Sequence, residues 1–419
     1  MATTSITVSD ACAAAKRAAL DLAQAGSATK DAALERIAEL LVERTDSILE
    51  ANAGDLDDEL AAGLTPALRD RLTLTPERIE AMAAGARAVI ALPDPVGEVL
   101  EERTLESGLE LRKLRVPLGV VGVVYEARPN VTIDCAALCI KSGNSVVLRG
   151  SSYAVRSNAA LTAVVEAGLE HVQLPAGGVQ LISGGREDLA ELATQENVVD
   201  LVIPRGGEGL KQALKAVATV PVMYAAAGNC HVYVHDDANL EMARRIAVNA
   251  KVGRPGVCNS AETLLVHADV ATDFLPGALA ELNGAGVELV GDARTRDAAG
   301  EVAVGEATVV DWDTEYLDLK LTVGVVDSLE EAVEHINRHG TGHSEAIVTS
   351  SSGAADAFTG AVDAAAVYVN ASTRFTDGFE FGMGAEIGNS TQKLHARGPI
   401  GLRELSTTKY VLRGDGQVR

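Results

Sequence analysis

Cys258 lies in the stretch RPGVCNSAETLLVH, residues 254–267, between a Pro-Gly turn and an apolar run. A structural cysteine usually has apolar neighbours, whereas two polar residues follow this one directly. Thiolates are strong nucleophiles, and nearby cations such as Lys251 and Arg254 lower the pKa of a thiol. The residue types alone leave two interpretations open, a catalytic nucleophile or an inert cysteine in a tight turn.

Two turns combine an arginine with small residues after apolar runs: Arg149, Gly150 and Ser151 after VVL, and Arg205, Gly206 and Gly207 after LVIP. Glycines allow backbone N–H groups to approach a phosphate closely, and a guanidinium binds phosphate through two hydrogen bonds. Neither turn has the spacing of a Walker loop or of the G-x-G-x-x-G fingerprint. Each turn alone is as compatible with a plain turn as with a phosphate site.

A cationic cluster occupies STQKLHARGP, residues 390–399, which places Lys393, His395 and Arg397 within five residues. Such a cluster could bind a carboxylate or a phosphate. It could equally form ion pairs between domains. The residue types do not decide between these two interpretations.

Metal binding is the weaker interpretation of the remaining cysteines and histidines. Cys135 and Cys139 are four residues apart in IDCAALCIK, where apolar neighbours indicate packed core thiols. His231 and His235 alternate in HVYVH, which fits one face of a strand. The sequence therefore favours no metal site, although these residue types can bind zinc.

Composition limits the class of protein. The chain has 419 residues, which predicts two or three domains. Its formal net charge of −23 argues against nucleic-acid binding, because that binding needs clustered Lys and Arg. Five scattered cysteines indicate reduced thiols, and there is neither a signal-peptide pattern nor a long apolar run, so we expect a cytoplasmic protein without a membrane partner.

The first third of the chain predicts helices and then a hairpin. Residues 10–91 are helical in pattern; for example, Leu34, Ile37, Ala38 and Leu41 share one helix face. Residues 97–119 form two extended runs around Ser107-Gly108. These runs are too polar for a core, so we expect an arm that mediates assembly.

From residue 116 onward, apolar strands alternate with helices, which predicts a parallel sheet with both faces covered. The expected strands are RVPLGVVGVVYE, SVVLRG, GVQLIS, VVDLVIP and VPVMYA, and the expected helices are 131–141, 153–171, 186–195 and 208–219. A second α/β segment begins near residue 231, and a final strand ends the chain. Doubly wound sheets bind ligands at the carboxyl ends of their strands, where both arginine turns are expected.

Several long motifs resemble one family: VVYEARPNVTIDCAALCIKSGNSVVLRG, LVIPRGG, GNCHVYV, RPGVCNSAETLLVH, VYVNASTRFTDG and AEIGNSTQKLHARGP. They are similar to the gamma-glutamyl phosphate reductase (glutamate-5-semialdehyde dehydrogenase) family, a branch of the aldehyde dehydrogenase superfamily. The resemblance covers essentially the whole chain. It implies an aldehyde-dehydrogenase-like α/β fold, with a doubly wound cofactor domain, an α/β catalytic domain and a β-hairpin oligomerisation arm.

The resemblance implies NADPH-dependent reduction of L-glutamyl 5-phosphate to L-glutamate 5-semialdehyde in proline biosynthesis. Cys258 then matches the nucleophile that forms a thioester, and Asn130 matches an oxyanion-binding asparagine. The cofactor residues implied are Arg149, Gly150, Ser151, Arg205, Gly206 and Gly207, with the Arg149 guanidinium suiting a 2′-phosphate. Candidate substrate anchors are Arg128, Arg374, Lys393 and His395.

One absence supports the resemblance, and two positions depart from it. The stretch MYAAAGNCHVY contains no carboxylate where hydrolytic relatives carry a glutamate base, which suits an enzyme that must not hydrolyse its thioester. Ala225-Ala226-Ala227 replaces a segment in which relatives have a glycine, and this could alter the fit of the cofactor. Asn389 stands where an apolar residue is expected.

The expected organisation is an NADP-binding domain (1–97 and 115–230), a catalytic domain (231–396) and an arm with the C-terminal strand (98–114 and 397–419). The implied partners are a small-molecule substrate, further copies of the chain and glutamate 5-kinase. Two alternatives stay open. One is an acylating dehydrogenase for another acyl phosphate or an acyl-CoA, and the other is a catalytically silent scaffold for the kinase.

Overall fold

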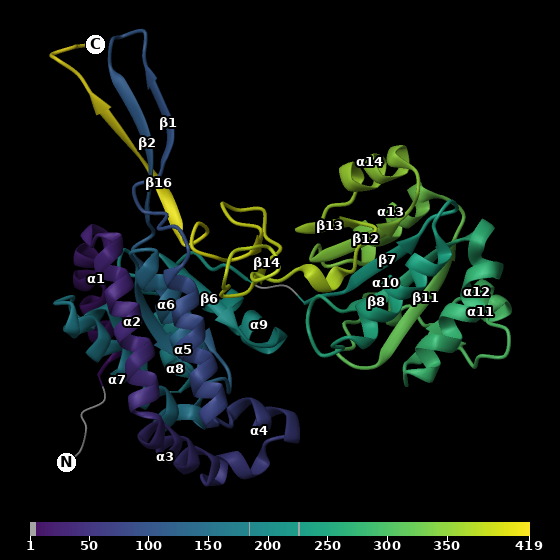
Figure 1. Ribbon diagram of the computed structural model, residues 1–419, viewed down its shortest axis with the longest axis horizontal. Helices are drawn as coiled ribbons and strands as arrows, with labels where there is room; N and C mark the ends of the chain where they lie inside the picture. Colours follow the sequence, from purple (N-terminus) through teal and green to yellow (C-terminus); the bar gives the residue numbers. More distant parts are fainter. Residues whose placement is uncertain (1–5, 184, 225–226) are drawn as a thin grey trace. The chain divides into compact units, whose positions relative to one another are not determined.

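The computed structural model describes residues 6–183, 185–224 and 227–419, which fall into two compact units (Figure 1). Unit 1 comprises Met1–Tyr224, Gly382–Gly388 and Ile400–Arg419, and unit 2 comprises Ala225–Phe381 and Asn389–Pro399. Each unit has its own parallel sheet. Residues 98–114 and 400–419 belong to unit 1, and their role in assembly stays a prediction.

Helices open unit 1, as the sequence predicts: α1 (Val8–Gln24), α2 (Ser27–Glu43), α3 (Thr45–Leu56), α4 (Pro66–Leu72) and α5 (Pro76–Ile90). The apolar face of α2 that contains Leu34 and Leu41 is buried. Helix α5 begins where the Thr75 side chain accepts the N–H of Arg78 and proline takes the first helical position. Local sequence signals therefore determine both its start and its buried face.

The sheet of unit 1 has the order β5-β4-β3-β6, from Val179–Ile182, Ser145–Arg149, Val120–Tyr125 and Leu201–Arg205. All of its pairings are parallel. Helices α6 (Asn130–Lys141), α7 (Val155–His171) and α8 (Arg186–Leu192) connect the strands, and α9 (Glu208–Val217) follows β6. The chain runs outward from β3 to β4 and β5 and then returns to place β6 on the other side of β3. The carboxyl ends of β3 and β6 thus form a topological switch point, where such sheets bind ligands.

Two strand predictions for unit 1 were wrong in detail. The run 115–126 is divided by a turn at Gly119, which has a φ of +127°. Strand β2 ends at Pro117, and β3 begins at Val120. A Cβ on Gly119 would lie 2.3 Å from the Asp200 carboxylate, which accepts the Val120 N–H at 2.8 Å, so no other residue fits this turn. In the described part of 220–225, ladder pairing is limited to one parallel bridge, between Val202 and Val222.

The predicted hairpin is confirmed as β1 (Val99–Thr104) and β2 (Glu110–Pro117), which pair antiparallel around Gly108 at φ +84°. The C-terminal strand β16 (Ser406–Arg413) pairs antiparallel with β2 over its whole length. Figure 1 shows these three strands standing away from the helices of the same unit. Leu100, Tyr410 and Leu412 are exposed on them, although soluble proteins usually bury such side chains.

Unit 2 contains a seven-stranded parallel sheet of order β10-β9-β11-β8-β7-β12-β13. Its strands are β7 (Cys230–Val234), β8 (Ala261–His267), β9 (Glu288–Gly291), β10 (Gly305–Glu306), β11 (Lys320–Val326), β12 (Ser344–Val348) and β13 (Ala366–Val369). Its helices are α10 (Leu240–Val252), α11 (Ala268–Gly284), α12 (Ala293–Ala298), α13 (Leu329–His339) and α14 (Ser352–Ala361). The short strands β14 (Asn389–Ser390) and β15 (Gly398–Pro399) pair antiparallel. The sequence did not predict α11, α12, α14 or β9.

Both faces of this sheet are buried. Val232 and Val234 on β7 pack with helices α10 and α11. Tyr233, between them, faces Phe358 of α14 and Ile336 of α13. Successive strand residues point to opposite faces, so a continuous apolar run is the expected signature of such a strand.

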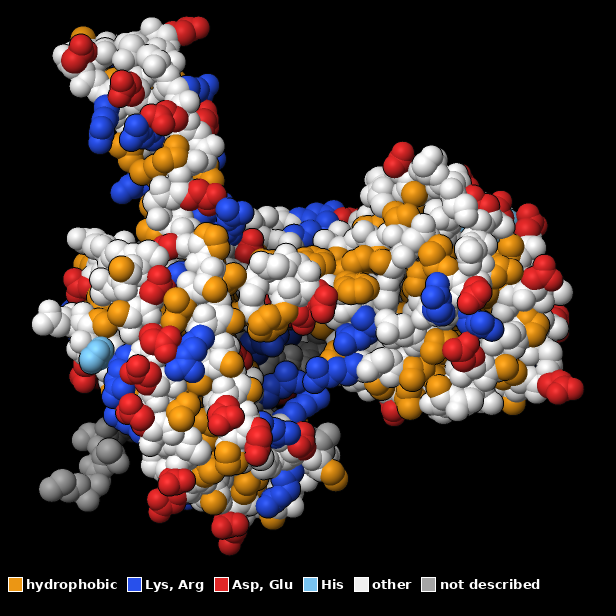
Figure 2. Space-filling model, in the orientation of Figure 1, with side chains coloured by type: hydrophobic (Ala, Val, Ile, Leu, Met, Phe, Trp, Pro, Cys, Tyr) orange, Lys and Arg blue, Asp and Glu red, His pale blue; other side chains and the backbone are white. Residues whose placement is uncertain are grey.

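The charges on the surface and the hydropathy of the helices agree with the composition. Figure 2 shows acidic side chains spread over the drawn face and interspersed with Lys and Arg. Among the described residues, no helix is long and apolar enough to cross a membrane.

Candidate active site

Cys258 lies in the loop between α10 and β8, at the amino end of β8. It is partly exposed, whereas Cys12, Cys135, Cys139 and Cys230 are buried, and all five are thiols rather than disulfides. Burial raises the pKa of Cys135 to about 12 and that of Cys12 to about 11, which keeps those two thiols protonated. Of the five cysteines, Cys258 is therefore the one placed for chemistry.

The two polar residues after Cys258 anchor its loop. The Asn259 amide donates to the carbonyls of Arg374 (3.2 Å) and Thr376 (3.0 Å). The Ser260 hydroxyl donates to the Ala250 carbonyl at 3.1 Å. These hydrogen bonds tie the loop to the end of α10 and to the short helix η5 (Thr373–Phe375), so a polar stretch is held rigidly at the mouth of an apolar strand.

Arg374 is the predicted substrate anchor that the fold brings close to Cys258. Its backbone carbonyl binds Asn259, and its guanidinium is half-buried. Burial lowers the pKa of Arg374, Arg254 lowers it further, and Cys258 raises it. A thiolate at Cys258 would thus have the Arg374 guanidinium close to it, which stabilises its charge.

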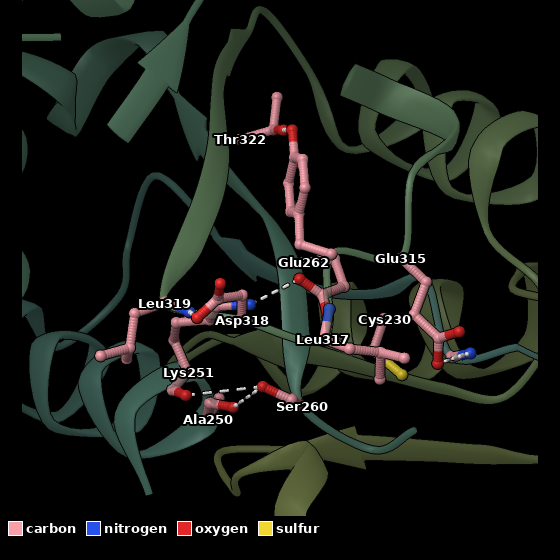
Figure 3. Close-up of polar contacts among 12 residues, drawn as sticks. Cys230, Ala250, Lys251, Ser260, Glu262, Glu315, Leu317, Asp318, Leu319 and Thr322 are labelled. Carbon is pink, nitrogen blue, oxygen red and sulfur yellow. Dashed lines mark hydrogen bonds and ion pairs between the residues drawn. The ribbon is translucent and has the colours of Figure 1, made fainter. Parts of the chain in front are cut away.

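Lys251, one of the cations that the sequence places near Cys258, is paired with Glu262. Its ammonium lies 2.5 Å from the Glu262 carboxylate, and both side chains are completely buried. Figure 3 shows Glu262 reaching from β8 toward the backbone of Leu317, whose N–H it accepts at 3.3 Å. Burial raises the pKa of Glu262 to about 7 and lowers that of Lys251, while each charge opposes the shift of the other.

The cationic cluster in residues 390–399 is an ion-pair cluster at two of its positions. Lys393 and Arg397 both pair with Asp363, the latter at 2.8 Å. These two cations hold the pKa of the Asp363 carboxyl below its usual range. Lys393 and His395 are exposed, and their roles as substrate anchors stay predictions.

The turn after β4 carries the first group of predicted cofactor residues. Arg149 donates to the Gly185 carbonyl at 2.8 Å, and Glu187 and Asp188 lie close enough to act on its charge. A Cβ on Gly150 would lie 2.1 Å from the Asn158 amide nitrogen, so only glycine fits. The Ser151 hydroxyl accepts the Tyr153 N–H at 3.1 Å and is thus used as a cap.

The turn after β6 carries the second group and lies at the switch point. A Cβ on Gly206 would approach Leu210 and Glu126 within 2.9 Å, whereas Gly207 has open space around it. The Gly207 N–H, just before α9, donates to Glu126 at 3.3 Å. An open glycine at a helix N-terminus allows a phosphate to approach the backbone.

Asn130 begins α6, just beyond the carboxyl end of β3. Its amide donates to the Asp134 carboxylate at 3.0 Å. Burial raises the pKa of Asp134 to about 6, while Asn130 and Arg205 oppose the rise. The fold thus places Asn130, Arg205 and the glycine turn at the same end of the unit 1 sheet, as the sequence predicts for its ligand edge. Arg128 lies between β3 and α6, and its role as a substrate anchor stays a prediction.

His231 and His343 in unit 2 are buried and His335 is half-buried, and burial favours the neutral form of all three rings. Burial lowers the pKa of His343 from 6.5 to about 4 and those of His231 and His335 to about 3. For His343, the unfolded chain binds a proton below pH 6.5, but the folded chain does so only near pH 4. Its contribution to stability is therefore present above pH 6.5 and is lost as the pH falls toward 4.

We expect His343→Asn to flatten this acid sensitivity. Between pH 7 and pH 5, the variant should lose about 1–2 kcal/mol less unfolding free energy than the wild type. Urea unfolding at the two pH values measures the difference. His171→Asn, at the exposed end of α7, is the control and should keep the wild-type slope. An unchanged slope in His343→Asn would mean that the folded protein already protonates this ring.

Two acidic clusters have ligand atoms near enough to hold a metal ion: His235, Asp236 and Asp237, and Asp236, His267 and Asp269. They lie just after β7 and β8, at the carboxyl ends of these strands, whereas Cys258 lies at the amino end of β8. Most of their members are exposed, and hydrogen bonds such as His235 to Asp237 at 2.8 Å already occupy them. The cysteines weighed above as zinc ligands, Cys135 and Cys139, are buried in α6.

Sequence reasoning missed three residues of the Cys258 surroundings: Gly228, Glu262 and Glu315. A glutamate inside the apolar strand AETLLVH was a usable signal, because a buried charge needs a partner. Asn389, which stands where an apolar residue is expected, is buried in β14. Ala225 and Ala226, in the AAA segment noted above, lie outside the described residues.

The parallel sheet with a switch point and the anchored cysteine loop are the layout of an aldehyde dehydrogenase, and the Aldehyde dehydrogenase family model matches residues 1–298. A gamma-glutamyl phosphate reductase of Thermobifida fusca is 54% identical over 406 residues, which is 97% of each chain. The crystal structure of gamma-glutamyl phosphate reductase from Thermotoga maritima is 45% identical, has a TM-score of 0.96 and covers 99% of this chain and 100% of its own.

A glyceraldehyde-3-phosphate dehydrogenase from Methanocaldococcus jannaschii, solved in complex with NADP, is 17% identical over 99% of this chain and 96% of its own, with a TM-score of 0.68, so it shares the fold alone. The chain belongs to the gamma-glutamyl phosphate reductases, oxidoreductases of the aldehyde dehydrogenase family.

Proposed function

We propose that the protein reduces L-glutamyl 5-phosphate to L-glutamate 5-semialdehyde, with release of phosphate, as a step of proline biosynthesis in the cytoplasm. The observation that carries the proposal is Cys258, a partly exposed thiol on a hydrogen-bonded loop beside Arg374, in a chain whose relatives are named gamma-glutamyl phosphate reductase. A thiolate next to guanidinium groups suits a substrate that carries a carboxylate and an acyl phosphate.

Cys258 acts as the nucleophile. Its thiolate attacks the acyl carbon, a carbon–sulfur bond forms, and the bond to the phosphate oxygen breaks, so phosphate leaves and a thioester remains. The Asn130 amide donates to the carbonyl oxygen as negative charge develops there. After reduction of the acyl carbon, the carbon–sulfur bond breaks, the aldehyde leaves, and the thiolate is restored.

The edge of the unit 1 sheet fits a nicotinamide dinucleotide. Gly207 leaves open space before α9 at the switch point, and Arg149, Gly150 and Ser151 follow the neighbouring strand β4. In the proposed site, Arg205, Gly206 and Gly207 hold the pyrophosphate, and Arg149 lies at the ribose. When bound, NADPH supplies the hydride for the reduction.

Arg149 is expected to set the preference for NADPH over NADH. In Arg149→Ala, the ratio of kcat/KM for NADPH to that for NADH should fall by about 10- to 100-fold, because a guanidinium–phosphate contact is lost. Arg87→Ala, which removes an exposed guanidinium of α5, is the matched control and should leave the ratio unchanged. An unaltered ratio in Arg149→Ala would assign the ribose to other residues. Glu187, which lies near Arg149, repels a 2′-phosphate.

The test of the proposed reaction runs it backwards, which avoids the labile acyl phosphate. Purified protein receives glutamate semialdehyde, NADP and phosphate, and NADPH formation is followed by absorbance. We expect a signal that depends on phosphate. NADPH formation that is independent of phosphate, or that requires coenzyme A instead, would replace this reaction by that of another acylating dehydrogenase.

Assembly and partner binding belong to the same proposal. The exposed apolar side chains of β16 and the β1–β2 hairpin support contacts with a second copy of the chain. Glutamate 5-kinase is the proposed supplier of the acyl phosphate, since a labile intermediate benefits from direct transfer.

A further inference from the structure

Gly228 lies directly against the peptide group of Cys258. A Cβ at this position would lie 1.5 Å from the Cys258 carbonyl oxygen and 2.7 Å from its Cα, so no side chain fits. Gly228 has no positive φ, and the requirement for glycine is therefore one of space rather than of backbone conformation. The main chain just before β7 is thus a rigid support for the backbone of the nucleophile.

The segment Gly228–Cys230, which we call the backbone support, is held along its length. The Asn229 amide donates to the carbonyls of Trp312 (2.7 Å) and His339 (2.8 Å). The Cys230 thiol donates to the Cys258 carbonyl at 3.2 Å, and burial raises the pKa of Cys230, which preserves this donor. The support thus contacts the Cys258 carbonyl both by packing and by a hydrogen bond.

Glu315 holds the other end of the backbone support. Its carboxylate accepts the Gly228 N–H at 2.6 Å, a charge-assisted hydrogen bond. Figure 3 shows Glu315 and Leu317 on the same stretch before β11, with Leu317 donating to Glu262. This stretch therefore binds both the support and the strand that follows the cysteine loop.

We propose that Glu315 is a positioning residue, which fixes the backbone of Cys258 through the Gly228 N–H so that the thiolate keeps its attacking geometry. The role deepens the proposed function, because it requires Cys258 to be the nucleophile. The stretch MYAAAGNCHVY has no carboxylate of its own, but the Glu315 carboxylate from elsewhere in the chain accepts its Gly228 N–H.

Alkylation by iodoacetamide tests the proposal without cofactor or substrate. The Cys258 thiolate displaces iodide, a carbon–sulfur bond forms, and peptide mass spectrometry gives the rate at this cysteine alone. We expect Glu315→Ala to slow alkylation by at least about tenfold. The Gly228 N–H then loses its hydrogen bond to a charged group, and the backbone of Cys258 is no longer fixed in its attacking geometry. Glu315→Gln keeps an acceptor oxygen and should stay within about twofold of the wild type.

Glu331→Ala is the matched control, because Glu331 accepts the Asp327 N–H, also at 2.6 Å, at the start of α13. It should alkylate at the wild-type rate. If Glu315→Ala does not fold, Glu315→Asp, which is one methylene too short to reach, takes its place with the same expected loss.

In the backward reaction, Glu315→Ala should lower kcat and leave the KM for the semialdehyde unchanged. A wild-type alkylation rate in Glu315→Ala, with only the KM for NADP raised, would overturn the proposal and assign Glu315 to the cofactor. If Glu315→Ala alkylates slowly but the wild type has no phosphate-dependent activity, the positioning role is retained and the proposed reaction is rejected.

Discussion

Cys258→Ala is expected to abolish phosphate-dependent NADPH formation, with a loss of about 10⁴-fold or more. Without the sulfur no thioester forms, and the remaining groups can only bind and polarise the substrate. Cys258→Ser should recover less than about 1%, because a serine hydroxyl is a far weaker nucleophile than a thiolate beside the Arg374 guanidinium. The backward reaction with semialdehyde and phosphate measures both variants.

Two controls separate lost chemistry from lost structure. Cys12→Ala removes a buried thiol of unit 1 and should keep the wild-type rate. NADPH fluorescence should show that Cys258→Ala still binds the cofactor, since the proposed cofactor residues are in unit 1 and Cys258 is in unit 2. Activity above about 1% in Cys258→Ala would remove the thioester mechanism.

The scaffold alternative makes the opposite prediction in cells. Cys258→Ala protein should fail to restore growth without proline in a strain that lacks this activity. Restored growth would favour a silent partner of the kinase, because a scaffold does not need the thiol. The loop around Cys258 argues for chemistry, because hydrogen bonds from its two polar neighbours hold a partly exposed thiol in place.

The sequence predicted those parts of the fold that depend on local signals. The buried face of α2, the proline start of α5 and the glycine at the hairpin turn all follow from residue spacing. It failed where the signal is not local. Residues 116–125 are without a charge, and the break at Gly119 is explained by the contact with Asp200, which is distant in the sequence.

The candidate site was predicted as a set of residue types and not as an arrangement. Cys258 and Arg374 are 116 positions apart, and the Asn259 side chain joins their segments. Lys251 was assigned to the thiol because it is near in sequence, yet its side chain turns away to Glu262. Side-chain direction and long-range pairing decide such roles, and neither is contained in the spacing.

Removing either partner of the Lys251–Glu262 pair is expected to cost about 3–5 kcal/mol of unfolding free energy at pH 7. The remaining side chain is then a fully buried charge without its partner, and becoming neutral is the least costly way to relieve this. From ordinary pKa values, neutralising a lysine at pH 7 costs about 5 kcal/mol and neutralising a glutamate about 4 kcal/mol. Glu262→Gln should therefore be less stable than Lys251→Met.

The two single variants should respond to pH in opposite directions. In Lys251→Met, the surviving glutamate has a pKa raised by burial, so the folded state holds the extra proton and stability is lost as the pH rises from 5 to 8. In Glu262→Gln, the surviving lysine has a pKa lowered by burial, so the folded state holds fewer protons and stability increases as the pH rises. Urea unfolding at pH 5.5, 7 and 9 measures both slopes.

The double variant Lys251→Met/Glu262→Leu completes the test. With no buried charge left, it should be within about 2 kcal/mol of the wild type and should show neither slope. Lys320→Met, which removes one partner of the surface pair with Glu288, is the matched control and should cost less than about 1 kcal/mol. Parallel slopes in the two single variants would mean that the pair is not buried in solution, and the Cys258 loop would then lack the rigid base that its hydrogen bonds require.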